Sequence, residues 1–407
     1  MFSLHETTQR RVCRVLFVVL CVIPTLLTLG WIANFYRPWR NSDLQREIGE
    51  RLHLIASVDE LASPKPGVTT LGSLQLADLH TQKPLGRIDT LNCQWQDSRL
   101  VLHADLLELE VSQLPHTAHA LATWLAGDRP VQVDLHVDQV VFLGGPFEIA
   151  TWRKMQFTSG WSKDLSKQIK ITVAPAEIDS ILSLEVMRSG TAMHLNLDAR
   201  QAPLPAWLLT DLLPGGLHRC PAASFKGLAK INWPATQAQG SLQGQFSNID
   251  LSEWLGTQGP HRLKGKASLK LQKLLWQSQR IEMAVGDLEA THGGASRTLI
   301  DAAVKWLQCL KTSACESKLR VHSTTLVPYD RLTFSFHLDS SGLKIVGQSM
   351  PRFLLTHQGE PLLGEPSSIL PIAALVQFLH LPVAGWLPDT TAAHEMAGGL
   401  PLPSPTQ

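Results

Sequence analysis

Residues 131–137 read VQVDLHV, and the alternation of side chains in this stretch indicates the fold class. In an extended chain the valines and the leucine lie on one side, and the polar residues between them lie on the other. This period of two is the pattern of a strand with one buried face. It returns in MHLNLDA at 193–199, in KASLKL at 266–271 and in LTFSFHL at 332–338. The sequence therefore predicts a mainly β protein.

The segments between the strands indicate how the strands pair. Gly-containing turns such as SSGL at 340–343 join strands that follow closely, which favours antiparallel meanders over βαβ units. In LVLHADLLELEV at 100–111 the apolar alternation changes phase between Leu106 and Leu107. A β-bulge produces such a slip of one residue and bends the sheet. We expect a curved antiparallel sheet with a few short helices.

Two segments predict a repeated strand-turn-strand unit. They are CQWQDSRLVLHADLLELE, which begins at Cys93, and LLWQSQRIEMAVGDLEA, which begins at Leu274. Aligning Trp95 with Trp276 also superposes a glutamine one residue later and an arginine further on. The match is short, so it indicates a repeated architecture more firmly than a duplicated sequence.

The composition is that of a folded chain without a strong electrostatic field. Of the 407 residues, 44% are hydrophobic and 17% are charged, which is too apolar for a disordered protein. Lys and Arg number 36, Asp and Glu number 35, and the formal net charge is +1. Because nucleic-acid binding depends on concentrated positive charge, we expect no nucleic-acid partner.

The segment 15–35, VLFVVLCVIPTLLTLGWIANF, contains no charged residue. At a helical rise of about 1.5 Å per residue, a segment of this length crosses the hydrocarbon core of a bilayer, which is about 30 Å thick. We therefore predict one N-terminal transmembrane anchor at 15–35. Trp31, Tyr36 and Trp39 gather at its end and are expected to be membrane-interface anchors, because aromatic rings prefer that level. A cleaved signal peptide is the rival interpretation, but Trp31 occupies the −3 position for cleavage after Ala33, and the apolar run is long.

The charges around this segment do not decide its orientation, since three arginines precede it and three follow it closely. Long domains cross a membrane largely regardless of their charge. We therefore expect residues 1–14 to lie in the cytoplasm and the large domain to lie on the opposite side of the membrane.

The chain after the anchor divides by composition. Residues 41–62 have apolar positions at helical spacing and predict a juxtamembrane helix, which the sequence SPKPG then breaks. A β-rich domain is expected over 70–349, and a Pro- and Gly-rich tail with one helix near 369–381 over 350–407. Within the β-rich domain we expect helices at 116–127, 203–216 and 296–310, the last with Ser296 as its N-cap.

The residues that commonly carry chemistry form no recognisable motif. The sequence has no GxSxG elbow, no Gly-rich phosphate loop and no HExxH or CxxC pair. His116 and His119 would share a helix face, but two ligands do not make a metal site. Cys309 and Cys315 could form a disulfide or remain separate buried thiols, and their spacing alone does not decide. We predict no enzyme activity, no catalytic residue, no metal site and no cofactor.

Three stretches together resemble the AsmA-like family of bacterial envelope proteins. They are HRLKGKASLKLQKLLWQSQRIEMAVGDLEATHGGASRTLIDAA at 261–303, YDRLTFSFHLDSSGLKIVG at 329–347 and FSNIDLSEWLG at 246–256. The resemblance is clearest over the C-terminal 200 residues. It implies a long, curved antiparallel sheet that is groove-like, in a single-pass protein of the bacterial inner membrane with a periplasmic domain. Its role would lie in lipid transport or outer-envelope assembly. The family offers no catalytic residues to carry over.

Two hypotheses follow, and one alternating pattern serves both. In the first, the apolar strand faces form an open groove that binds phospholipid acyl chains. In the second, they close into a core, and the protein is a non-enzymatic scaffold that binds other envelope proteins through its exposed edges or its tail. The candidate lipid-facing residues are Val133, Leu135, Leu195, Leu197, Phe334 and Phe336.

Overall fold

The fold is known from a computed structural model. The residues that it describes are 17, 20, 22–35, 39–52, 54–65, 67–79, 82–97, 99–114, 116–117, 132–144, 151–161, 167–175, 181–190, 192–212, 220, 222–233, 239–255, 261–278, 280–321, 326–349 and 352–379.

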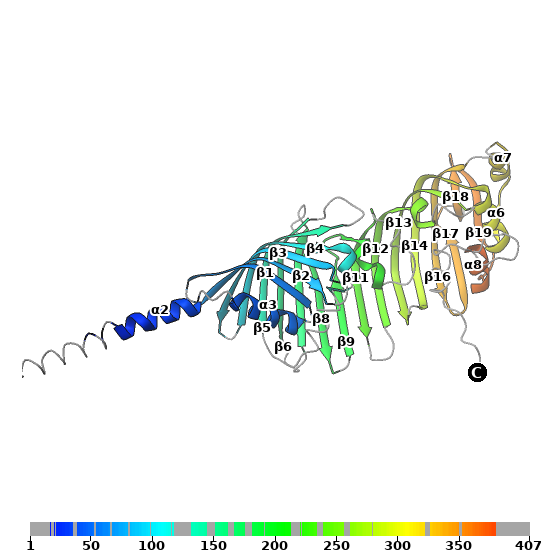
Figure 1. The fold of residues 1–407 in the computed structure, drawn as a ribbon. Coiled ribbons are helices and arrows are strands. Elements are labelled where there is room, and N and C mark those ends of the chain that lie inside the picture. Colours follow the sequence, from blue (N-terminus) through cyan, green and yellow to red (C-terminus); the bar gives the residue numbers. More distant parts are fainter. Residues whose placement is uncertain are drawn as a thin grey trace, which may run out of the picture.

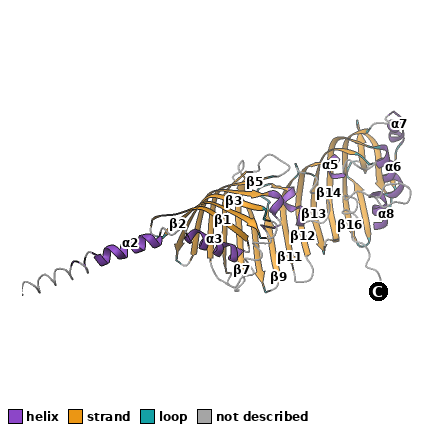
Figure 2. Cartoon of the chain, viewed as in Figure 1, coloured by secondary structure: helices purple, strands orange, loops and turns teal. Residues whose placement is uncertain are grey.

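The described residues form a mainly β structure built on a single 19-stranded sheet (Figures 1 and 2). The strands are β1 (Leu54–Lys65), β2 (Val68–Asp78), β3 (Pro84–Gln96), β4 (Arg99–Glu110), β5 (Gln132–Leu143), β6 (Thr151–Trp161), β7 (Lys167–Pro175), β8 (Leu182–Ser189), β9 (Ala192–Asp198), β10 (Leu204–Pro205), β11 (Ser224–Trp233), β12 (Gln239–Asp250), β13 (Leu263–Gln277), β14 (Arg280–Ala295), β15 (Cys309–Lys311), β16 (Val327–Asp339), β17 (Gly342–Gly347), β18 (Phe353–His357) and β19 (Glu360–Pro366). The helices are α2 (Ile23–Phe35), α3 (Trp39–Leu52), η2 (Val111–Gln113), η3 (Ala206–Leu212), α5 (Leu251–Leu255), α6 (Arg297–Trp306), α7 (Ser313–Val321) and α8 (Ile372–Leu379).

The sheet is long, curved and unclosed, as the sequence predicts. Strands β1 to β9 lie side by side in chain order, followed by β11 to β14 and β16. Beyond β16, both β17 and β18 pair with it, and β19 and β15 follow. Among the described strands every pairing is antiparallel except that of β4 with β5. Parallel neighbours need a crossover, and η2 begins the long connection between these two strands.

The predicted change of phase in β4 is confirmed, and it extends over six strands. In each of β1 to β6, two successive residues on the apolar side are three positions apart instead of two, and the residues between them are mostly exposed. We call this line the crease. Its flanking pairs are Val58 and Leu61, Leu71 and Leu74, Ile88 and Leu91, Ala104 and Leu107, Val137 and Val140, and Trp152 and Met155.

The crease bends the sheet without breaking its pairing. Ile88 still pairs with Leu107 and Leu91 with Ala104, because β3 and β4 change phase at the same level. At the other end of the line, the register between β6 and β7 shifts after Arg153. The bulge expected in β4 is not formed, because its register with β3 and β5 is unchanged across the phase change. A register shift of the kind a bulge produces occurs only at the β6–β7 end of the crease.

The segment 41–62 is not one helix, and this part of the prediction was wrong. Helix α3 ends at Leu52, and residues 54–65 form β1. The reason is visible in the burial of β1, where Leu54, Ala56 and Val58 are buried and the residues between them are exposed. The sheet thus begins well before residue 70.

Helix α3 packs against β1, the first strand of the sheet. The Gln45 side chain donates a hydrogen bond to the Val58 carbonyl oxygen at 3.0 Å. Gly49 allows a close approach, since a Cβ at this position would lie 2.7 Å from the Leu54 carbonyl oxygen. Covering an edge strand in this way limits edge-to-edge association.

The opposite end of the sheet carries three helices that differ in part from the prediction. Ser296 caps α6 as expected, because its Oγ accepts a hydrogen bond from the Leu299 amide at 3.3 Å. Helix α6 ends at Trp306, however, and β15 and α7 follow where we expected one helix to 310. Strands β18 and β19 lie within the expected tail, and α8 lies within the predicted range 369–381.

Two further predicted helices have different outcomes. The prediction of one helix at 203–216 was wrong, because this segment begins with the short strand β10 and continues as the 3-10 helix η3. Pro203 and Pro205 favour an extended start, and Leu204 pairs with Phe225. Of the segment 116–127, only the first two residues are described, and both are helical. The rest lies outside the described residues.

The N-terminal segment extends away from the sheet as α2 (Figure 1). Its apolar side chains are exposed, with Leu26 at 61% and Leu27 at 68%. None of the helices in the described part of the chain combines the length and the apolar character needed to cross a membrane. The expected anchor at 15–35 is described only in part, and residues 1–14 and 380–407 lie outside the described residues.

Candidate apolar binding face

The strand register joins apolar residues into ranks that cross the sheet from one strand to the next. We call the side of the sheet that carries these ranks the apolar face. The first rank is a continuous line of paired residues over eleven strands, β3 to β14 without β10. At about 4.8 Å between strands it is about 50 Å long. Its members are Trp95, Leu100, Val133, Ser159, Ile169, Val186, Leu195, Ile231, Gly240, Trp276 and Ile281.

A second rank runs beside the first, and it contains only apolar residues and one thiol. The two ranks are two residues apart on β3 to β13 and three apart on β14, where the register shifts. The second rank continues through β16 to β17. Neither rank contains a charged side chain. The members of the second rank are Cys93, Leu102, Leu135, Phe157, Ile171, Leu184, Leu197, Ala229, Leu242, Leu274, Ala284, Leu338 and Leu343.

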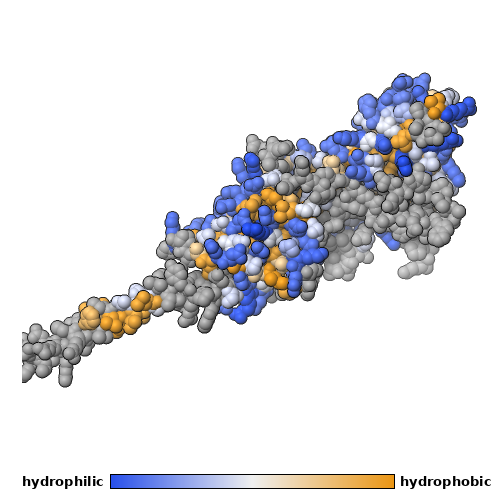
Figure 3. Space-filling view, turned by 45° about the horizontal axis from the view of Figure 1, so that its top comes forward, coloured by the Kyte–Doolittle hydropathy of each residue, from blue (hydrophilic) through white to orange (hydrophobic). Residues whose placement is uncertain are grey.

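Burial divides the second rank into two parts. From Leu102 in β4 to Leu184 in β8, every member is half-buried. From Leu197 in β9 to Leu343 in β17, every member is buried. The second rank is thus partly open to solvent on β4 to β8 and covered on β9 to β17. The first rank is mixed, since Ser159 and Ile169 are buried while Leu195 and Ile281 are half-buried. Figure 3 shows hydrophobic patches bordered by hydrophilic residues in the half of the molecule next to α2.

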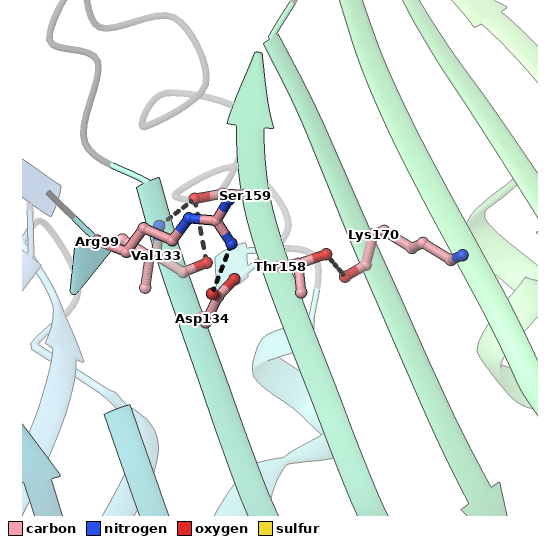
Figure 4. Close-up of polar contacts among 6 residues, drawn as sticks. All are labelled: Arg99, Val133, Asp134, Thr158, Ser159 and Lys170. Carbon is pink, nitrogen blue, oxygen red and sulfur yellow. Dashed lines mark hydrogen bonds and ion pairs between the residues drawn. The ribbon is translucent and has the colours of Figure 1, made fainter. Parts of the chain in front are cut away.

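The one hydroxyl in the first rank has backbone partners. Ser159 is 8% exposed, and its Oγ accepts a hydrogen bond from the Val133 amide at 3.0 Å (Figure 4). The same Oγ can donate to the Val133 carbonyl oxygen at 3.5 Å. Because both neighbours are backbone groups of the adjacent strand, Ser159 adds no unpaired polar atom to the apolar face.

The other side of the sheet is polar. Asp134, Thr158 and Lys170 are successive members of one rank on this side, and Figure 4 shows them on β5, β6 and β7. The Asp134 carboxylate forms an ion pair with Arg99 at 3.7 Å. Further along, the His194 ring nitrogen Nδ1 lies 2.8 Å from the Asn232 side-chain oxygen. This side therefore faces water, as the alternation predicts.

The six candidate residues all belong to the apolar face. Val133 and Leu195 are members of the first rank, and Leu135 and Leu197 are members of the second. Phe334 and Phe336 lie on β16 opposite Leu288 and Gly286, and their ring centroids are 6.4 Å apart. Leu197 is 6% exposed, and the other five are half-buried. The structure thus places all six on one surface, although Leu197 is not accessible there.

The predicted repeat is confirmed as an architecture. Trp95 pairs with Leu100 across the β3–β4 hairpin, and Trp276 pairs with Ile281 across the β13–β14 hairpin. The residues that follow the two strands, Asp97 and Ser278, both have positive φ, at 44° and 50°. The surroundings differ, because Trp95 is 62% exposed and Trp276 only 4%.

The expected membrane-interface anchors Trp31, Tyr36 and Trp39 lie where the structure does not describe the side chains. Trp31 lies on α2 and Trp39 begins α3, but their side chains are not described, and Tyr36 lies outside the described residues.

Groups that could carry chemistry are few in the described part of the chain. Cys93, Cys220, Cys309 and Cys315 are free thiols, so the Cys309–Cys315 disulfide is not formed. Burial raises the pKa of Cys309 to about 12, which makes a reactive thiolate unfavourable.

One exposed cluster of possible metal ligands lies outside the sequence prediction. His103 Nε2 lies 3.6 Å from an Asp138 carboxylate oxygen, and Asp105 lies on the other side of the ring. These residues are on the polar side beside the crease, and exposed groups of this kind are common without a metal. Of the histidine pair considered earlier, His116 is exposed and His119 lies outside the described residues.

Sequence reasoning missed that Trp161 and Ser159 belong to the apolar face. Residues 155–161 read MQFTSGW, in which serine and glycine interrupt the apolar pattern. The sequence does indicate this face, because Met155, Phe157 and Trp161 are separated by two and four residues and therefore lie on one side of an extended strand.

Comparisons of the chain with protein-family models, with curated proteins and with solved structures found no match.

Proposed function

We propose that this chain is a membrane-anchored protein of the bacterial envelope whose apolar face binds phospholipid acyl chains, in lipid transport or outer-envelope assembly. The observation that carries the proposal is the second apolar rank, which remains half-buried from β4 to β8. A soluble sheet normally covers such a face with helices or with a second sheet. An extended apolar surface left partly open is typical of a site for an apolar ligand or partner.

The proposed anchor is the uncharged segment 15–35. The exposed leucines of α2 support it, because a helix with apolar side chains on all sides is stable in lipid rather than in water. In this arrangement the anchor holds β1 and the half-buried part of the apolar face close to the bilayer that supplies the ligand. The remaining domain would lie in the periplasm.

A scaffold with a closed core is the second candidate. It is favoured by the burial of the second rank from β9 to β17, where Ala229 and Leu242 are each 2% exposed. In this alternative another envelope protein binds through the exposed edges of the sheet or through the tail, and no lipid binds. Both candidates are non-enzymatic.

Photo-crosslinking in membranes distinguishes the two candidates. A photoreactive amino acid is placed at Leu195, with His194 as the matched control, because the two residues are adjacent on β9 and face opposite sides. Leu135 and His136 form a second such pair on β5, where the second rank is half-buried. We expect radiolabelled phospholipid to be captured at Leu195 and Leu135 several times more strongly than at the histidines. Equal capture on both sides of the sheet would contradict lipid binding.

A deletion of residues 383–407 tests the scaffold. If the tail binds a partner protein, the deletion should abolish recovery of that partner in a pull-down. A lipid-binding face should keep its phospholipid capture at Leu195 after the same deletion. Loss of the partner together with an absence of lipid capture would favour the scaffold.

A further inference from the structure

A short motif, histidine and aspartate separated by one residue, occurs three times in the chain. It reads HAD at 103–105, HVD at 136–138 and HLD at 337–339. The three copies lie on β4, β5 and β16, and residues two positions apart on a strand point to the same side of the sheet. A single copy offers a metal ion only two ligands, which is too few for a stable site.

The parallel pairing of β4 with β5 brings the first two copies side by side. His103 pairs with His136, and the register stays constant along the whole pairing. Asp105 and Asp138 are therefore neighbours as well, because parallel strands advance in the same direction. An antiparallel pairing would reverse the order of one copy. We call these four residues, on the polar side beside the crease, the His–Asp square.

Three of the four side chains already converge. His103 Nε2 lies 3.6 Å from an Asp138 carboxylate oxygen, and His103 Nδ1 lies 3.9 Å from an Asp105 carboxylate oxygen. One ligand atom from each of these residues lies within 4.8 Å of the other two. Tetrahedral ligands at about 2.1 Å from zinc are separated by about 3.4 Å, so small side-chain rotations would bring them into place. His136, which is exposed beside His103, would complete the set.

The two aspartates of the square lack a permanent counter-ion. Like charges at neighbouring positions destabilise a sheet. In the part of the chain that the structure describes, Asp105 and Asp138 form ion pairs only with His103, and an imidazole is a cation only when it is protonated. Further along the same strands, by contrast, Asp134 has Arg99 at 3.7 Å. A divalent cation would supply the positive charge that the square lacks.

Exposed acidic groups are common without a metal, but this cluster differs from the ordinary case. It combines imidazole nitrogens with carboxylate oxygens, a set of ligands that zinc accepts and that magnesium and calcium rarely use. The third copy of the motif shows the ordinary case. His337 Nε2 lies 3.2 Å from an Asp339 carboxylate oxygen, but His337 pairs with Val285 on one side and with Lys344 on the other.

We propose that the His–Asp square binds one zinc ion, which ties β4 to β5 at the crease. Parallel pairing is slightly less stable than antiparallel pairing, and the chain joins these two strands through the long connection that begins at η2. An ion that binds only the folded state stabilises that state. The inference is independent of lipid binding, because the square lies on the side of the sheet opposite the apolar face.

The test uses the full-length protein without an affinity tag, in a non-ionic detergent and after treatment with EDTA. Zinc binding is measured by competition with a chromophoric chelator. We expect one zinc ion per chain and slower hydrogen exchange of β4 and β5 when zinc is present. The variants His103→Asn and Asp138→Asn should each weaken zinc binding by at least about tenfold. Co²⁺ probes the same ligands without a substitution, because four-coordinate Co²⁺ absorbs visible light strongly.

His337→Asn is the matched control, because it removes an exposed histidine from the third copy of the motif. This variant should bind zinc as the native protein does. If His103→Asn keeps the native affinity, or if His337→Asn loses as much, zinc is bound elsewhere and the proposal is wrong. Binding of less than one zinc ion per chain, a Co²⁺ form without strong visible absorption, or equal competition by Mg²⁺ would also overturn it.

Discussion

Trp276 and Trp95 occupy equivalent positions in the repeated hairpin, and we predict very different costs for their replacement by alanine. Trp276 is 4% exposed, and its ring lies over Gly240 of the neighbouring strand. Trp95 is 62% exposed. A tryptophan side chain has about 200 Å² to bury, and each Å² removed from water is worth about 25 cal/mol. Trp276→Ala should therefore cost up to about 5 kcal/mol, and Trp95→Ala at most about 2 kcal/mol.

Gly240 provides a second test of the same contact. A Cβ at this position would lie 1.9 Å from a ring carbon of Trp276, so the ring has to move. Overpacking of this kind costs about 1 to 3 kcal/mol. In the double variant with Trp276→Ala, the added methyl group would find space, and Gly240→Ala should cost less than it does alone.

The assay is urea unfolding of the full-length protein in detergent, with hydrogen exchange of β12 to β14 as the local measurement. Exchange is needed because a long sheet can open in parts rather than all at once. We expect Trp276→Ala to raise exchange in these three strands and Trp95→Ala to leave them unchanged. Equal costs for the two tryptophans, or no coupling between Gly240 and Trp276, would refute the reasoning.

Three further predictions concern the end of the sheet that bears α6 to α8. His261 stacks on Phe378 of α8 with ring centroids 6.3 Å apart, and burial lowers the pKa of His261 below 6.5. Because the unfolded chain therefore binds more protons below pH 6.5, the free energy of unfolding should fall as the pH drops through this range. Hydrogen exchange of α8 should be faster at pH 5.5 than at pH 7.5 in the native protein but not in His261→Phe. Cys309 and Cys315 should resist maleimide until denaturant is added, and a mass two daltons lower without reductant would contradict the free thiols. Ser296→Ala should cost about 1 kcal/mol in urea unfolding, because the helix cap is lost.

The strand pattern was predictable because each strand carries its own evidence. Alternating residues such as those at 131–137 and 332–338 lie on strands whose apolar side has the expected phase. The phase change in β4 was also readable, since apolar residues occur at consecutive positions. Its extension over β1 to β6 was not evident from one strand, because the neighbours show it only as a spacing of three between buried residues.

The errors in the prediction arose where a short segment satisfied two patterns. Residues 41–62 contain Leu44, Ile48, Leu52 and Ile55 at helical spacing, but Leu54, Ala56 and Val58 also alternate. Pairing of β1 with β2 decided in favour of the strand, and Ile55 is 38% exposed as a result. Local pattern alone could not resolve this, since the partner strand supplies the stabilisation.

The candidate face could be predicted as a set of residues but not as a surface. Alternation identified Val133, Leu195 and Phe336 as members of apolar strand faces. Whether such a residue is in a core or at an open surface depends on what covers it, and that information lies in segments remote in the sequence. Lys167 and Arg188 show the same dependence on remote segments, because they become neighbours only through the register of β7 with β8.

The two parts of the apolar face therefore differ in whether other elements of the protein cover them. The second rank passes from half-buried to buried between Leu184 on β8 and its pairing partner Leu197 on β9, while the residue types remain apolar. Beyond that point, apolar residues of η3, α5, α6 and α8 pack into the same cluster as the strands, and covered side chains of this kind contribute to stability. Before that point, the members of the second rank retain solvent contact and contribute less. A change at Leu184 or Val186 should consequently cost little in folding and much in ligand binding, whereas a change at Leu242 should do the reverse.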